Sequence, residues 1–66
     1  NVGFKNGLAI SFYKLSEINI KLNQKPVAKK YMQEAERVFG ELARDFPAYV
    51  QFKQYWEMAK DELARL

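Results

Sequence analysis

Apolar residues recur along this chain at steps of three and four positions, the spacing that places them on one face of an α-helix. The middle of the chain shows the most regular series, which comprises Ala28, Met32, Ala35, Phe39, Leu42 and Phe46. A series nearer the start comprises Phe4, Leu8, Phe12, Leu15 and Leu22, and one nearer the end comprises Phe52, Trp56, Ala59, Leu63 and Leu66. No segment alternates apolar and polar residues for long enough to predict a β-strand. The pattern predicts an all-α chain of three helices, with Leu8, Phe12 and Leu15 on the inner edge of the first.

Two short breaks separate the three segments, and each contains a proline. They are NQKP, residues 23–26, and DFPA, residues 45–48. Proline is tolerated in the first turn of a helix and keeps the preceding residue out of the α region, so each break ends one helix and starts the next. Asn23 can take the left-handed conformation that closes the first helix. The expected helices span about 4–23, 26–45 and 48–65, and the short breaks make neighbouring helices antiparallel.

The composition predicts a folded domain. Of the 66 residues, 48% are apolar and 15% are aromatic, whereas disordered segments lack the apolar residues that build a core. A domain of this length buries only about 60% of the surface of its unfolded chain, so its stability is expected to be marginal. We expect a single domain over residues 1–66, and the absence of an initiating methionine indicates a piece of a larger protein.

Missing residue types exclude several classes of site. The chain has no cysteine and no histidine, so it lacks disulfides, thiolate zinc sites and the commonest general base. Carboxylates such as Glu57 and Asp61 share a helical face, but no histidine or glycine-rich loop accompanies them to build a catalytic site. We therefore expect a non-catalytic protein that holds no cofactor and no metal.

Charge and hydropathy indicate which partners and which compartment to expect. Eleven Lys and Arg residues against eight Asp and Glu residues leave a net charge of +3, which is too small to require a polyanionic partner. No apolar run approaches the roughly 18 residues that predict a membrane-spanning helix, and the N-terminus lacks the basic and apolar regions of a signal peptide. We expect a cytoplasmic protein that is not associated with a membrane.

The two ends of the chain resemble each other when the sequence is shifted by 48 residues. The shift aligns Val2 with Val50, Phe4 with Phe52, Lys5 with Lys53, Leu8 with Trp56 and Leu15 with Leu63. The first and third helices are then the same element in successive units of a helical array, with the second helix between them. Lys60 stands where the first unit has Phe12, which makes the third helix closer to an end cap.

Several residues match the pattern of a known repeat. Phe12 is the large residue of a first helix, Leu15 and Ser16 stand for a Leu-Gly pair, and Asn19 replaces an aromatic residue. The second helix has small residues at Ala28 and Ala35 with Met32 between them, and Pro47 closes the unit. On these positions the chain resembles the tetratricopeptide repeat family, whose unit of about 34 residues is a pair of antiparallel helices. The phrase GLAIS followed by YKL is similar to the long bacterial tetratricopeptide repeats, and the 48-residue shift implies a unit of about 48 residues in which both helices are longer by two turns.

The resemblance implies a protein-interaction or scaffolding module that binds a protein or peptide partner in a concave groove. By position, the groove side of the first helix comprises Ile10, Tyr13, Lys14, Glu17, Ile20 and Lys21. Alternatively, Ile10, Tyr13 and Ile20 simply pack on a neighbouring unit. An excised unit also leaves apolar surface uncovered, so we expect either self-association into a homo-oligomer or cover by a neighbouring segment.

Two further alternatives stay open. The first is a plain three-helix bundle whose ends look alike by chance and which self-associates, since heptad-like spacing is common to all such bundles. The second is weak nucleic-acid binding by the lysines around the first break, Lys21, Lys25, Lys29 and Lys30. Acidic residues follow those lysines and no nucleic-acid motif is present, so nucleic acid is not the expected partner.

Overall fold

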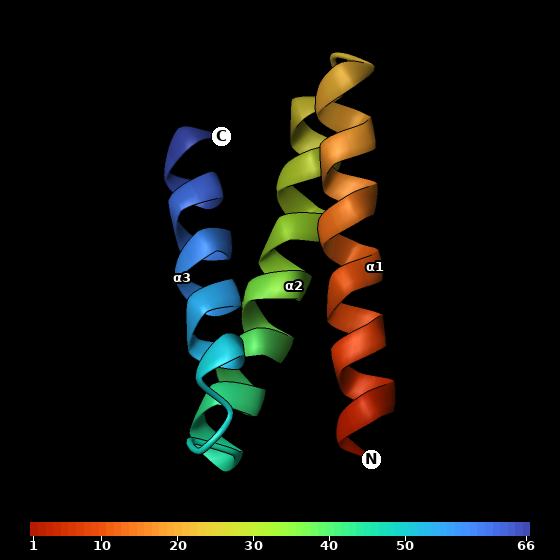
Figure 1. Cartoon of the computed structure of the whole chain (residues 1–66). Helices are drawn as coiled ribbons and strands as arrows, with labels where there is room; N and C mark the ends of the chain where they lie inside the picture. Colours follow the sequence, from red (N-terminus) through yellow and green to blue (C-terminus); the bar gives the residue numbers. More distant parts are fainter.

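Three antiparallel helices lie side by side with the second helix in the middle (Figure 1). The computed structural model describes all residues, 1–66, as α1 (Val2–Lys21), α2 (Lys25–Asp45) and α3 (Val50–Arg65). Helix α2 packs against both neighbours, whereas α1 and α3 scarcely touch each other. The Cα trace measures 36 × 21 × 13 Å, so the helices form one flat layer rather than a closed bundle. The predicted all-α three-helix fold is confirmed.

The ends of the helices depend on local hydrogen bonds and on one left-handed residue. The Phe4 N–H donates to Asn1 Oδ1 at 2.8 Å, an N-cap that starts α1 at Val2 rather than at the expected residue 4. Asn23 has a φ of 58°, as predicted, and α1 ends at Lys21 rather than at 23. The Tyr49 N–H donates to the Phe46 carbonyl at 3.0 Å in a turn, which delays α3 from the expected residue 48 to Val50.

The core is built mainly from α2. Its buried residues are Ala28, Met32, Ala35, Val38, Phe39 and Leu42, so the apolar series predicted for this helix is confirmed except at Phe46, which is exposed. From α3, Phe52 and Ala59 are buried, and Trp56, Leu63 and Leu66 pack against the core. These five residues are the apolar series that was predicted for the third helix. Phe39 is only 1% exposed and lies at the centre of this cluster.

The inner edge predicted for α1 is wrong at two of its three positions. Leu8 and Leu15 are each 38% exposed, and only Phe12 packs against the core. Helix α1 instead approaches α2 through the small residues Ala9 and Ser16, both fully buried. The Ser16 hydroxyl donates to the Ala28 carbonyl at 2.7 Å, a distance that a large side chain at either position would prevent. Side-chain size therefore selects the packed face of α1.

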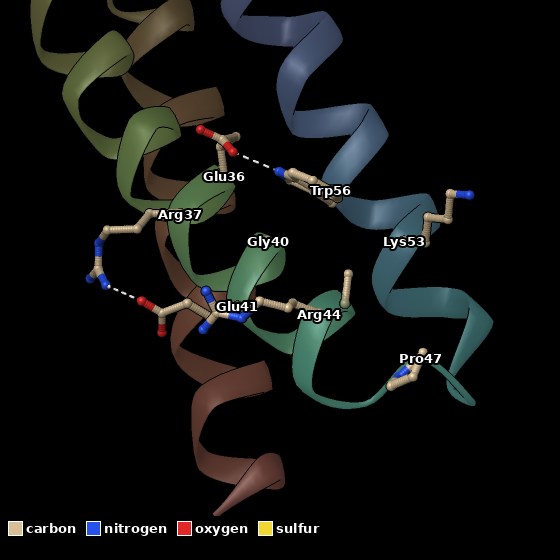
Figure 2. Close-up of a pocket in the computed structure, with 9 residues that line it drawn as sticks. Glu36, Arg37, Gly40, Glu41, Arg44, Pro47, Lys53 and Trp56 are labelled. Atoms are coloured by element: carbon tan, nitrogen blue, oxygen red, sulfur yellow. Dashed lines mark hydrogen bonds and ion pairs between the residues drawn. The ribbon is translucent and has the colours of Figure 1, made fainter.

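Gly40 allows α3 to approach α2 closely. A Cβ atom added at Gly40 would lie 3.1 Å from Trp56 Nε1, closer than ordinary van der Waals contact, whereas one added at Gly7 would meet nothing within 4 Å. Figure 2 shows the indole of Trp56 beside the Gly40 backbone. The two glycines therefore have different roles, since only Gly40 makes room for a neighbour.

Replacement of the two glycines by alanine should change the free energy of unfolding differently. Gly7→Ala is expected to raise the free energy of unfolding by about 1 kcal/mol, because alanine is the better helix former. Gly40→Ala should give no gain or a loss, because the new methyl group pushes against the Trp56 ring. Urea denaturation followed by circular dichroism measures both. An equal gain at the two sites would contradict the close contact at Gly40.

Candidate protein-binding groove

Four of the six residues predicted on the groove side of α1 line a single cavity. Ile10, Tyr13, Lys14 and Glu17 form one wall of a space of about 190 Å³. The rest of the lining consists of residues from the other two helices: Phe39, Tyr55 and Met58. A groove thus runs between α1 and α3, with one residue of α2 at its floor.

The arrangement of the helices explains why the groove exists. Because α2 packs against both α1 and α3 while these two scarcely touch, the side of α2 between them is the floor. Phe39 fills that floor, and its ring centroid lies 5.3 Å from that of Tyr55 on α3. Met58 is exposed and Ile10 half-buried, so the two walls present apolar surface to solvent above the Phe39 ring.

Tyr13 supplies a partly buried hydroxyl group to the α1 wall of the cavity. Burial raises the pKa of the Tyr13 phenol above its ordinary value of 10.0, the nearby carboxylates of Glu62 and Glu17 raise it further, and Arg65 lowers it. The phenol therefore keeps its proton at neutral pH and is available as a hydrogen-bond donor.

The raised pKa of Tyr13 predicts a loss of stability in alkali. The unfolded chain gives up this proton near pH 10, but the folded chain holds it to a higher pH, so the free energy of unfolding should fall as pH rises past about 10. Tyr13→Phe should remove this part of the fall. Urea denaturation of both proteins at about pH 9 and about pH 11 measures the difference. Identical declines would show that Tyr13 lies in an ordinary aqueous environment.

The two charges on the α1 wall are free to meet a partner. Lys14 and Glu17 are exposed, and neither takes part in the ion pairs of the folded chain. Ile20 and Lys21, the other two predicted groove residues, do not line the cavity. Ile20 is half-buried and Lys21 exposed, at the end of α1 beyond the cavity-lining residues. The cavity therefore occupies only part of the predicted groove face.

Sequence reasoning missed the wall formed by α3. Tyr55 and Met58 line the cavity but were not among the predicted groove residues. The internal repeat contained the signal for one of them, because Met58 lies 48 residues after Ile10, and both line the same cavity. The shift that relates the two ends of the chain therefore relates one residue of each wall, Ile10 and Met58.

A second, wider hollow of about 820 Å³ lies elsewhere on α2 and α3 (Figure 2). Its charged residues largely neutralise one another within the chain. Arg37 pairs with Glu41 at 3.0 Å and with Glu34 at 2.8 Å. The Trp56 indole N–H donates to Glu36 Oε2 at 2.6 Å. Among the charged residues that line this hollow only Lys53 has no ion pair or hydrogen bond within the chain, so the hollow offers a ligand fewer unpaired charges than the groove does.

The remaining candidates do not form a site. Lys21, Lys25, Lys29 and Lys30 are all exposed around the turn between α1 and α2. No three Asp or Glu side chains lie together in a way that would hold a metal ion. None of the helices combines the length and apolarity required to cross a membrane. No protein-family model, no curated protein and no solved structure matches the chain.

Proposed function

We propose that this chain is a protein-interaction module, a tetratricopeptide-like segment of helical repeat that binds a partner peptide in the groove between α1 and α3 and has no catalytic activity of its own. One observation carries the proposal. The face of α1 that the repeat pattern assigned to partner binding forms a wall of a cavity, and the opposite wall comes from α3.

The single-layer arrangement supports a repeat over a closed bundle. In a closed three-helix bundle each helix packs on the other two, and the space between the first and third is filled. Here α1 and α3 scarcely touch, so α2 serves as a shared neighbour, as it does in an array of stacked units. The groove is a direct consequence of that arrangement.

The dimensions and chemistry of the cavity indicate the kind of partner. Its volume of about 190 Å³ is below the roughly 300–1,000 Å³ of small-molecule and cofactor sites, and it suits one anchoring side chain of a longer peptide. Apolar groups line most of it, and Tyr13 can donate a hydrogen bond. The unpaired charges of Lys14 and Glu17 lie at the same wall. The expected ligand is a peptide with a large apolar side chain that has charged residues of both signs nearby.

Selection from a displayed library of random peptides tests this function. The immobilised chain is expected to enrich peptides that share one aromatic or large aliphatic anchor. Their binding should fall by about tenfold or more in Met58→Glu, because a carboxylate replaces apolar surface at the mouth of the cavity. Val27→Glu is the matched control, since Val27 is exposed and does not line the cavity.

Two outcomes would count against the groove. One is a failure to enrich any peptide family, and the other is enriched peptides that bind Met58→Glu and Val27→Glu with the affinity of the unaltered chain. Circular dichroism of both variants checks that neither substitution changes the helical content.

A further inference from the structure

The outer face of α1 carries a row of large apolar residues that nothing covers. Phe4, Leu8, Leu15, Ile18 and Leu22 are all exposed, Phe4 by 70%. With Ser11 they follow steps of four and three along the helix, so they share one face. We call these six residues the outer stripe. A soluble domain this small rarely exposes so continuous an apolar row without a partner.

The same stripe occurs in α3, where it is covered. A shift of 48 residues places Phe4 on Phe52, Leu8 on Trp56, Ser11 on Ala59, Leu15 on Leu63 and Ile18 on Leu66. All five of these counterparts, four in α3 and Leu66 directly after it, belong to the core or pack against it. Phe52 is 4% exposed, in contrast to Phe4. The residues that α1 leaves in solvent are therefore the counterparts of those with which α3 packs on α2.

The contact between α3 and α2 defines what would cover the outer stripe. The indole of Trp56 lies against Gly40 and donates to Glu36, and Phe39 and Tyr55 are ring neighbours. Helix α2 thus offers α3 a small residue at the crossing point with apolar and acidic residues around it. Leu8, the counterpart of Trp56, has no side-chain N–H group. The helix that packs on Leu8 therefore needs a small residue like Gly40 but no hydrogen-bond acceptor like Glu36.

We infer that the outer stripe is the docking surface for an amphipathic helix of the α2 type that lies outside residues 1–66. A second copy of the chain cannot provide this helix without unfolding, because α1 and α3 already cover α2 on both sides. The helix would reach α1 through a turn like that at Phe46–Tyr49, since Asn1 is the counterpart of Tyr49 in the shift.

The opposite end of the layer is not built for the same extension. The α1 residues that pack toward α2 include Ala9, Phe12 and Ser16, and the counterparts of these three in α3 are Glu57, Lys60 and Ala64. Glu57 and Lys60 pair with each other at 3.2 Å on the surface. Charged side chains at Glu57 and Lys60 give α3 no apolar row comparable to the outer stripe, so we place the additional helix beside α1. This inference rests on the repeat within the proposed function but concerns a different surface from the groove.

A chain extended at its N-terminus tests the inference. A second copy of residues 25–48 is placed directly before Asn1, so that it connects to α1 as α2 connects to α3. We expect the extended chain to be monomeric and its thermal midpoint to rise by about 10 °C or more as the stripe becomes buried. The same extension on a Leu8→Lys, Leu15→Lys double variant should give little or no rise. Both leucines are exposed, so the unextended double variant is expected to fold.

A fluorescence measurement locates the added helix. In a Trp56→Phe, Leu8→Trp variant, the only indole lies on the outer stripe, and its emission should shift to shorter wavelength when the extension is present. The inference is overturned if the extension leaves the midpoint unchanged, if the double variant gains as much, or if the indole at position 8 stays in water. It is also overturned if the unextended chain is a dimer that the double variant dissociates. Peptide selection tests binding in the groove and does not depend on the outer stripe. Failure of the helix-docking inference can therefore be distinguished from failure of the proposed function.

Discussion

Replacement of Phe39 by alanine is expected to unfold most of the protein at room temperature. Phe39 is 1% exposed, belongs to the central cluster and lies beneath both walls of the groove. Removing a buried phenylalanine side chain costs about 3–5 kcal/mol, and a single core in a domain of 66 residues rarely supplies more than about 3–5 kcal/mol of stability in total. Urea denaturation followed by far-ultraviolet circular dichroism should show a chain with little or no folded baseline.

The control for this change is the same substitution at a solvent-exposed position. Phe4 is 70% exposed, so Phe4→Ala should alter the free energy of unfolding by no more than about 0.5 kcal/mol. If the two variants were equally stable, Phe39 would not be the centre of the core, and the floor of the groove would be misplaced.

Replacement of Trp56 by alanine should detach α3 from α2 over part of its length. The substitution removes the ring that packs on Gly40 and the hydrogen bond to Glu36. Trp56 is half-buried, so we expect a loss of about 2–3 kcal/mol, below the value for a fully buried tryptophan. Chemical denaturation measures the loss, and amide hydrogen exchange should show the greatest loss of protection in α3.

Two milder substitutions separate the contributions of Trp56. Trp56→Phe keeps an aromatic ring but removes the N–H donor, and should cost about 1 kcal/mol. Lys60→Ala removes the ammonium group that lies 4.0 Å from the centre of the indole ring, and should cost about 0.5–1 kcal/mol. A Trp56→Ala variant no less stable than Lys60→Ala would mean that the indole does not hold α3 in place.

The sequence predicted α2 well because only one side of that helix is apolar. Its outer side carries charged residues such as Glu34, Arg37 and Glu41, which pair with one another, so the buried series was unambiguous. The breaks were equally clear, because proline and the left-handed Asn23 leave few alternatives. The expected bounds differed by two residues at the start and end of α1 and at the start of α3, where an N-cap and a turn decide them.

Helix α1 was harder to predict because it is apolar on more than one side. Periodicity alone selected Leu8 and Leu15, together with Phe12, as its inner edge. The structure buries Ala9 and Ser16 instead, since close helix packing depends on small side chains that periodicity does not distinguish from other positions. For a related reason, only the α1 wall of the cavity contains residues that were predicted. A pattern on one helix identifies one wall, but the residues of α3 that face it depend on how the three helices are arranged.

Partner binding in the groove is tested by mapping where a selected peptide contacts the folded chain. Amide resonances are followed by nuclear magnetic resonance during titration with a peptide enriched from the displayed library. We expect the largest chemical-shift changes at Ile10, Tyr13 and Glu17 on one wall and at Tyr55 and Met58 on the other. Changes centred instead on Lys25, Lys29 and Lys30, or on the outer stripe of α1, would contradict the assignment of partner binding to the groove between α1 and α3.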